Sequence, residues 1–265
     1  MYYSNKEADI YYKIIGEGKP LLILHGFSID HRGLQGILEE STSLKTKYKR
    51  IYIDLPGMGK SNVHNKDMNA DNLLTILIEF VHKVIGERSF SILGYSYGGY
   101  LALGLIKKLP TKIKKAVLLA PVVKAENSSR TLPEKHVNKV ESFDVDNQLV
   151  FEQYKHAVVN ITEASYKNYL TEIQPGLSVG DQEFQKSFQR DGYKLAFEER
   201  LLLNDATCER LIILGKQDDV VGYEDVTKHR KKLLNSRIIL LDNAGHNLQL
   251  DERDVIRKEL SIFLT

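Results

Sequence analysis

A serine held between glycines is the residue of this chain best placed to do chemistry. Ser96 lies in Gly94-Tyr95-Ser96-Tyr97-Gly98, after the apolar run at 90–93 and before a segment rich in Leu and Ala. This order predicts a strand, a tight turn and a helix, with the serine at the apex of the turn. The flanking glycines carry no side chain that would collide with the strand or the helix. We therefore expect Ser96 to point outward, where a base can reach its hydroxyl.

A histidine and an acid late in the chain complete a nucleophilic arrangement. His246 follows Gly245 after the apolar run at 236–241, and Asp218 and Asp219 follow the apolar run at 210–215. A free serine is a weak nucleophile near neutral pH, so a histidine must take its proton during the attack. An acid that accepts a hydrogen bond from that histidine fixes its tautomer and stabilises the imidazolium. Ser96, His246 and one of the two aspartates are thus the candidate catalytic set.

A second loop could stabilise the negative charge that such an attack creates. The apolar run at 21–24 is typical of a strand buried on both faces, and it ends in His25-Gly26-Phe27. If this loop lies beside Ser96, the amide N–H groups of Phe27 and Tyr97 can meet at one oxygen atom. Because the backbone would do that work, we interpret His25 as a structural residue of the loop.

The elements that must position these residues alternate along the chain. Residues 1–15 predict a hairpin at the edge of a sheet. Further strands are expected at 21–24, 50–55, 90–93, 113–119, 210–215 and 236–241, and helices at 71–85, 225–234 and 255–264. Such alternation is typical of the α/β class, with a mostly parallel, twisted sheet and helices on both faces. Gly59-Lys60-Ser61 is not a phosphate loop, because Asp54 stands where that motif requires glycine.

The alternation breaks between residues 122 and 205. This stretch is more polar and has helical spacing at 149–161 and 166–173. We interpret it as a helical insertion that forms a lid over the carboxyl end of the sheet, while residues 1–121 and 206–265 form the core. Most aromatic residues at helical spacing serve packing, but some should face a substrate. The candidates for substrate binding are Phe151, Tyr154, Tyr166, Phe184 and Phe188.

Composition excludes several classes of protein. The 265 residues suffice for a large core, and a single cysteine, Cys208, excludes an internal disulfide. A net charge of +2 with 27% charged residues argues against nucleic acid or an anionic membrane as the main partner. The N-terminus lacks the pattern of a signal peptide, and no apolar run reaches the roughly 18 residues of a membrane span. We expect a soluble, cytoplasmic monomer or homodimer that acts on a small molecule.

Taken together, these motifs resemble those of the α/β-hydrolase superfamily, in the branch that carries lids. The pentad around Ser96 is similar to the nucleophile elbow of that family, and Leu24-His25-Gly26-Phe27 is similar to its oxyanion loop. The segment 54–61 resembles its D-x-P-G-x-G-x-S turn. The order Ser, Asp, His is also that of the family. Gly215-Lys216-Gln217-Asp218 resembles the strand-end acid of the family, and this G-x-x-D spacing favours Asp218 over Asp219.

The resemblance implies a serine hydrolase that cleaves a small ester, thioester or lactone through an acyl-enzyme on Ser96. Members of the same fold cleave carbon-carbon bonds in ring-fission products, or the amide after an N-terminal residue such as proline, and both alternatives stay open. A small-molecule receptor that keeps the fold is the non-enzymatic alternative. An aminopeptidase would need lid carboxylates for the ammonium of its substrate. The candidates for this role are Glu152, Glu163, Glu172, Glu198 and Glu199.

No metal or organic cofactor is expected. The eight histidines show no H-E-x-x-H spacing, and there is no second cysteine that could pair with Cys208 on zinc.

Overall fold

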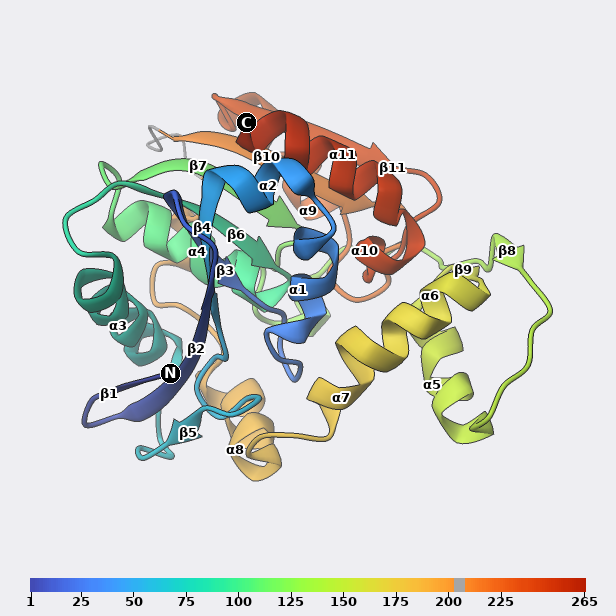
Figure 1. The fold of residues 1–265 in the computed structure, drawn as a ribbon, viewed down its shortest axis with the longest axis horizontal. Helices are drawn as coiled ribbons and strands as arrows, with labels where there is room; N and C mark the ends of the chain where they lie inside the picture. The colour runs from blue at the N-terminus through green and yellow to red at the C-terminus, as the bar shows by residue number, and fades with distance from the viewer. Residues whose placement is uncertain (203–207) are drawn as a thin grey trace.

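The computed structural model describes residues 1–202 and 208–265, and its centre is one long sheet (Figure 1). The strand order is β1-β2-β4-β3-β6-β7-β10-β11, and β5 pairs with β2. The strands are β1 (Tyr2–Ser4), β2 (Ala8–Ile15), β3 (Lys19–Leu24), β4 (Tyr48–Ile53), β5 (Asn62–Val63), β6 (Phe90–Tyr95), β7 (Ile113–Leu119), β10 (Glu209–Gly215) and β11 (Ser236–Leu241). The expected α/β architecture is confirmed.

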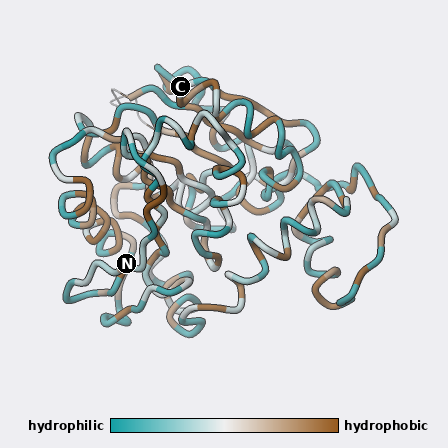
Figure 2. The backbone as a smooth tube through the Cα atoms, viewed as in Figure 1, coloured by the Kyte–Doolittle hydropathy of each residue, from teal (hydrophilic) through white to brown (hydrophobic). Residues whose placement is uncertain are grey.

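The sheet brings the ends of distant segments to one edge. The six strands from β4 to β11 pair in parallel, whereas β1, β2 and β5 pair antiparallel, so the predicted edge hairpin is also confirmed. Of the parallel strands, β3, β4, β6, β7 and β10 are buried along most of their length, whereas the edge strand β11 is mostly partly exposed. The residues of these strands are mostly hydrophobic (Figure 2). Because their carboxyl ends meet at the same edge, the segments that follow β3, β6, β10 and β11 gather there.

Two groups of helices cover the sheet (Figure 1). One group is α1 (Arg32–Glu39), α2 (Thr42–Lys47) and α11 (Arg253–Leu264), which contact one another. The other is α3 (Ala70–Phe80), which continues as a π-helical turn over Val81–Ile85, and α4 (Tyr97–Lys108). The helix expected at 71–85 therefore starts one residue earlier. Its N-cap is Asn69, whose side chain accepts the N–H of Asn72, and Asp71 lies in the first turn.

The prediction of one helix over residues 225–234 is wrong. Only α9 (Glu224–Thr227) and a 3₁₀ turn at Arg230–Lys232 form there. Residues 228–232 carry four cationic side chains and a histidine, and like charges on successive turns destabilise a helix. Asn235 then takes a positive φ of 56°, which a helix cannot continue through. The short α10 (Leu248–Asp251) follows β11 and precedes α11.

Residues 122–205, called the insertion from here on, are mainly helical where the structure describes them. Its elements are β8 (Lys139–Val140), α5 (Gln148–Ala157), β9 (Asn160–Ile161), α6 (Glu163–Asn168), a π-helical turn (Tyr169–Ile173), α7 (Gln174–Leu177), α8 (Gln182–Ser187), a second π-helical turn (Phe188–Gly192) and 3₁₀ turns at Asn127–Ser129 and Glu198–Arg200. The helix expected at 149–161 ends at Ala157, and β9 pairs with β8. Helices α5 to α7 extend beyond the sheet, and α8 lies at its lower side (Figure 1). The predicted boundary between 205 and 206 lies outside the described residues.

Candidate active site

Ser96 occupies a sharp turn between β6 and α4. Its backbone has φ 54° and ψ −117°, a conformation that costs a residue with a side chain about 1 to 3 kcal/mol. The turn also packs tightly, because a Cβ at Gly98 would collide with the carbonyl oxygens of Leu24 and His25, and one at Gly94 with the carbonyl of Gly98. The sequence therefore needs glycine on both sides of the serine, as expected from the pentad.

The structure brings Ser96, His246 and Asp218 into one chain of hydrogen bonds. The hydroxyl oxygen of Ser96 lies 2.9 Å from Nε2 of His246, and Nδ1 of the same ring lies 2.9 Å from Oδ2 of Asp218. A carboxylate accepts only, so Nδ1 carries the proton and Nε2 is free to accept the serine hydroxyl. The His246 side chain is 11% exposed and that of Asp218 is 1% exposed. The imidazole is thus oriented to take a proton from Ser96.

Asp218 is held in its charged form. Burial alone would raise its pKa, but the charge and hydrogen bond of His246 and the backbone N–H groups of Val220 and Val221 lower the pKa below its usual value. The neighbouring Asp219 points elsewhere, with its carboxylate 3.8 Å from Nζ of Lys135. Of the two aspartates that the sequence offers, Asp218 is the one that contacts the histidine.

The backbone amides of Phe27 and Tyr97 come from the two loops that meet at Ser96. Tyr97 is the first residue of α4, so its N–H has no partner within the helix. The loop after β3 approaches closely, since a Cβ at Gly26 would lie 3.3 Å from Cβ of Ser96. The rings of Phe27 and Tyr97 meet edge to face, with centroids 5.7 Å apart. Within residues 1–202 and 208–265 the Phe27 N–H donates no hydrogen bond, so it is available to a ligand oxygen.

His25 braces this loop. Its Nε2 accepts the N–H of Leu55 at 2.9 Å, and Nδ1 therefore donates to the carbonyl of Gly26 at 2.6 Å. The ring is fully buried, and burial lowers its pKa, so it stays neutral. The interpretation of His25 as a structural residue agrees with these contacts.

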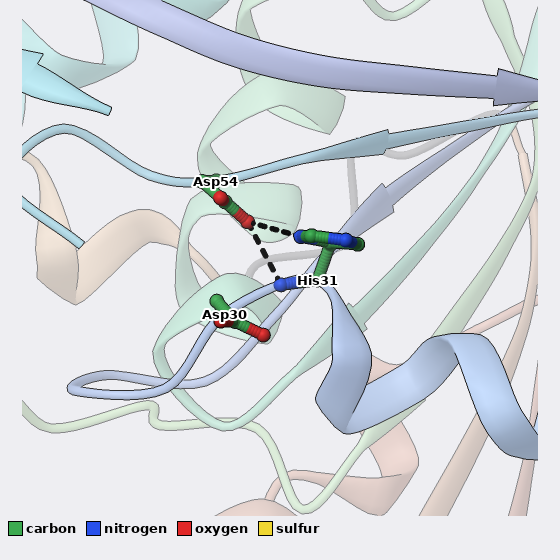
Figure 3. A group of neighbouring side chains, drawn as sticks. All are labelled: Asp30, His31 and Asp54. Atoms are coloured by element: carbon green, nitrogen blue, oxygen red, sulfur yellow. Dashed lines mark hydrogen bonds and ion pairs between the residues drawn. The ribbon is translucent and has the colours of Figure 1, made fainter. Parts of the chain in front are cut away.

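Asp30, His31 and Asp54 form a second brace where the loop after β3 meets the end of β4 (Figure 3). Asp54 accepts the backbone N–H of His31 at 2.9 Å, its Nδ1–H at 2.7 Å and the N–H of Lys60 at 2.9 Å. Burial would raise the pKa of Asp54, but these donors lower it. Asp30 pairs with Arg32. The carboxylates are thus engaged by protein donors, and the cluster fixes the two loops to each other.

A cavity of about 500 Å³ opens over Ser96 and His246. The core contributes Gly26, Phe27, Ile29, Tyr95, Ser96, His246 and Asn247, and the insertion contributes Gln153, His156, Ala157, Tyr169, Ile173 and Leu177. None of these lining residues is Lys, Arg, Asp or Glu. The cavity therefore suits an uncharged, largely apolar ligand.

The five aromatic residues expected to bind substrate lie elsewhere, since none lines this cavity. Phe151, Tyr154 and Tyr166 pack on one another inside the insertion, and the Tyr154 hydroxyl lies 3.3 Å from the carbonyl oxygen of Asn160 and 3.1 Å from that of Thr162. Phe188 stacks on Phe27 with centroids 6.1 Å apart, and Phe184 packs behind it. The aromatic pattern identified side chains that pack against other protein residues, and such side chains are not available to a substrate in this cavity.

The five glutamates considered for an aminopeptidase do not line the cavity either. Glu172 is buried and pairs with Arg253 at 2.6 Å, while Glu198 accepts the hydroxyl of Tyr100 at 2.6 Å and the N–H of Ala125 at 2.7 Å. The other three, Glu152, Glu163 and Glu199, are not buried. Among residues 122–202, no carboxylate thus lines the cavity where it could hold a substrate ammonium.

Beyond Phe27, Ser96 and His246, sequence reasoning missed most residues that line the cavity. Tyr95 and Asn247 flank Ser96 and His246 in the chain, so their positions were a usable signal. The Tyr95 hydroxyl donates to Oδ1 of Asn247 at 2.9 Å, and its ring lies 5.3 Å from that of His246. Gln153 and His156 lie one turn apart on α5, away from the hydrophobic face that the periodic pattern identifies. No sequence signal distinguished them from other polar residues of the helix surface.

Comparisons with known proteins agree with this architecture. A family model described as the alpha/beta hydrolase fold matches residues 19–253. The crystal structure of an alpha/beta superfamily hydrolase from Oenococcus oeni PSU-1 is 34% identical, with a TM-score of 0.91, and the match covers all of this chain and 98% of that one. No helix among residues 1–202 and 208–265 is long and apolar enough to cross a membrane.

Two further relatives are named for different activities. A pimeloyl-[acyl-carrier protein] methyl ester esterase of Nitrosomonas europaea is 30% identical over 116 residues, which span 43% of this chain and 41% of that protein. The proline iminopeptidase PfmaB of Pestalotiopsis fici is 24% identical over 96% of this chain and 95% of its own length.

Proposed function

Because this chain belongs to the alpha/beta hydrolase family and is a hydrolase, we propose that it cleaves a small, uncharged ester, thioester or lactone through an acyl-enzyme on Ser96. The observation that carries the proposal is the chain of hydrogen bonds from Ser96 through His246 to Asp218 at the base of a cavity without charged side chains.

In the first step, the hydroxyl oxygen of Ser96 attacks the carbonyl carbon while its proton passes to Nε2 of His246. The carbonyl π electrons move onto oxygen, and the amides of Phe27 and Tyr97 donate to that oxyanion. A donor of this kind is worth about a hundredfold to a thousandfold in rate. The intermediate collapses, the bond to the leaving group breaks, and His246 protonates the leaving oxygen or sulfur. Water then attacks the acyl-enzyme, with His246 again taking the proton. The bond between the acyl carbon and the Ser96 oxygen breaks, and His246 returns the proton to that oxygen.

Asp218 serves both halves of the cycle. It holds the proton of His246 on Nδ1, which leaves Nε2 free to accept, and its charge balances the imidazolium that forms. Its lowered pKa keeps that charge down to acid pH.

The cavity favours an ester over an N-terminal peptide. A free N-terminus carries a positive charge near neutral pH, and burying it without a partner is costly. The lining residues offer it no carboxylate, whereas they suit an acyl chain. The esterase named among the relatives is therefore the better guide to the reaction than the iminopeptidase.

The insertion acts in this proposal as the lid of the core. Ala157, Tyr169, Ile173 and Leu177 form an apolar wall over the acyl site, and Gln153 and His156 supply polar groups beside it. A wall of this kind selects acyl groups by size, with one methylene worth about 1 to 3 kcal/mol.

A substrate panel tests the reaction class. p-Nitrophenyl esters, aminoacyl arylamides and a ring-fission dienone should be offered in parallel, and we expect turnover of the esters. A fluorophosphonate should label one residue, Ser96, in the same sample. Arylamide or dienone turnover above that of the esters would assign the chain to an alternative reaction, and binding without turnover or labelling would indicate a receptor.

A further inference from the structure

The loop that carries His246 lies against the insertion. The side-chain amide of Asn247 donates to the carbonyl of Ala157 at 3.0 Å, and that of Asn160 donates to the carbonyl of Asn243 at 2.8 Å. Residues 157–160 and 243–247 therefore lie side by side. Ala157 also lines the cavity, so this contact joins the wall of the proposed acyl site to the histidine that works on it.

Asp251 lies at the centre of this contact. One carboxylate oxygen, Oδ1, accepts the backbone N–H groups of Val159 at 2.9 Å and Asn160 at 3.0 Å. The other, Oδ2, accepts the N–H of Gly245 at 2.9 Å. One oxygen thus serves the insertion, and the other serves the residue directly before His246.

The surroundings of Asp251 disfavour the charged form of its carboxylate. Among the described residues no cation lies within ion-pair distance of it, and Lys135 is the positive charge that acts on it from the insertion. Tyr95 of β6, Tyr154 of α5, His246 and the adjacent Glu252 are the other titratable groups near it. Burial raises its pKa to about 6, against the lowering effect of the three N–H donors. A group held at such a cost is a candidate for a role beyond folding.

We propose that Asp251 is a positioning residue of the reaction, which holds the His246 loop and residues 159–160 of the insertion in one fixed relation. The inference rests on the proposed function, because the atom it positions is Nε2 of His246. When Asp251 is ionised, the imidazole and the wall of the acyl site keep a common geometry. Loss of either oxygen as an acceptor lets them shift independently.

An amide in place of the carboxylate tests this directly. In Asp251→Asn, one oxygen can still accept, but the NH₂ group must face a backbone N–H, so either the insertion or the histidine loop loses its acceptor. A misplacement of about 1 Å in reacting groups costs about a hundredfold. We expect a loss of ten- to a hundredfold in kcat for p-nitrophenyl acetate, a smaller change in KM, and an equal loss in the rate of fluorophosphonate labelling.

Two further variants isolate the positioning role. Asp251→Glu keeps two accepting oxygens and should recover part of kcat. Asp254→Asn removes a carboxylate that is 86% exposed and bonded to Arg257, and it should match the wild type. A merely structural role for Asp251 would lower the melting temperature and leave kcat per folded molecule unchanged.

Amide NMR supplies a readout that does not depend on turnover. In the wild type, the N–H resonances of Val159, Asn160 and Gly245 should shift together with one midpoint near pH 6, and in Asp251→Asn the shared titration should disappear. Wild-type kcat and unchanged labelling in Asp251→Asn would overturn the inference. Absence of ester turnover and labelling in the wild type itself would instead overturn the proposed function, while the NMR titration would still report on the contact.

Discussion

Asp218 accepts a hydrogen bond from Nδ1 of His246 at 2.9 Å, and the residue next to it in the chain does not reach the ring. Two backbone N–H groups, from Val220 and Val221, hold the other oxygen of Asp218. The turn after β10 thus selects one of two adjacent aspartates, and the selection can be measured.

Asp218→Asn should lower kcat about ten-thousandfold, because the amide can stabilise the wrong tautomer of His246 and cannot balance the imidazolium charge. Asp219→Asn is the matched control, and it should stay within about tenfold of the wild type. Steady-state rates on p-nitrophenyl acetate decide the matter. A larger loss in the Asp219 variant would show that the acid is wrongly assigned by one residue.

Substitutions at Ser96 should separate chemistry from strain. Ser96→Ala and Ser96→Gly should both lose hydrolysis and labelling, since neither has a nucleophile. Their stabilities should differ, because glycine accepts φ 54° and ψ −117° and alanine does not. Strain of about 1 to 3 kcal/mol, less about 1 kcal/mol for the entropy of glycine, predicts that the glycine variant is the more stable. Urea unfolding of the two variants gives the difference, and equal midpoints would mean that the strain in the turn does not exceed the entropy cost of glycine, about 1 kcal/mol.

Two leucines of the insertion offer a matched test of acyl selection. Leu177 lines the cavity and is 39% exposed, whereas Leu170 is 37% exposed and does not line it. Leu177→Ala should change the ranking of p-nitrophenyl esters from acetate to octanoate, and Leu170→Ala should leave it unchanged. If both variants keep the wild-type ranking, the specificity must come from the loops of the core.

The raised pKa of Asp251 should be visible in how the stability of the protein depends on pH. In the folded protein its pKa is about 6, raised by burial from 3.8, so the folded state holds this proton more tightly than the unfolded state does. The contribution to stability is full below about pH 4 and is lost as the pH rises through 6, a change of up to about 3 kcal/mol. Relative to the wild type, Asp251→Asn should therefore gain stability between pH 5 and pH 8. Denaturant unfolding of both proteins at pH 5 and at pH 8 checks this. If Asp251→Asn instead loses stability relative to the wild type between pH 5 and pH 8, the raised pKa is contradicted.

The sequence predicted those parts of the site that local geometry determines. A strand, two glycines and a helix can hold a serine in one way only, because Gly94 and Gly98 leave no room for side chains. Parallel strands also bring their carboxyl ends to one edge, so the segments with Asp218 and His246 had to lie near Ser96. These features require no knowledge of how the insertion packs.

The lining of the cavity depends on that packing and was not predicted. Periodicity along α5 identified Tyr154 as a residue of the hydrophobic face of the helix. It could not indicate that this face packs inside the insertion, whereas Gln153 and His156 line the cavity. Asp251 was missed for a related reason. Its role comes from three N–H groups in two distant segments, and no pattern within residues 248–264 records them.

Strands β7 and β10 are neighbours in the sheet, and they run parallel with Leu119 opposite Ile213. The chain between them is therefore a crossover connection, which must travel from the carboxyl edge back to the amino edge, about 23 Å for seven residues of strand. Anyone who grafts a foreign lid onto this core has to keep that return path. Its described part includes Leu195, whose N–H donates to the hydroxyl of Tyr100 on α4. A chimaera in which residues 126–190 are replaced and residues 193–202 are retained would have a new cavity wall. It would keep the described part of the connection from β7 to β10.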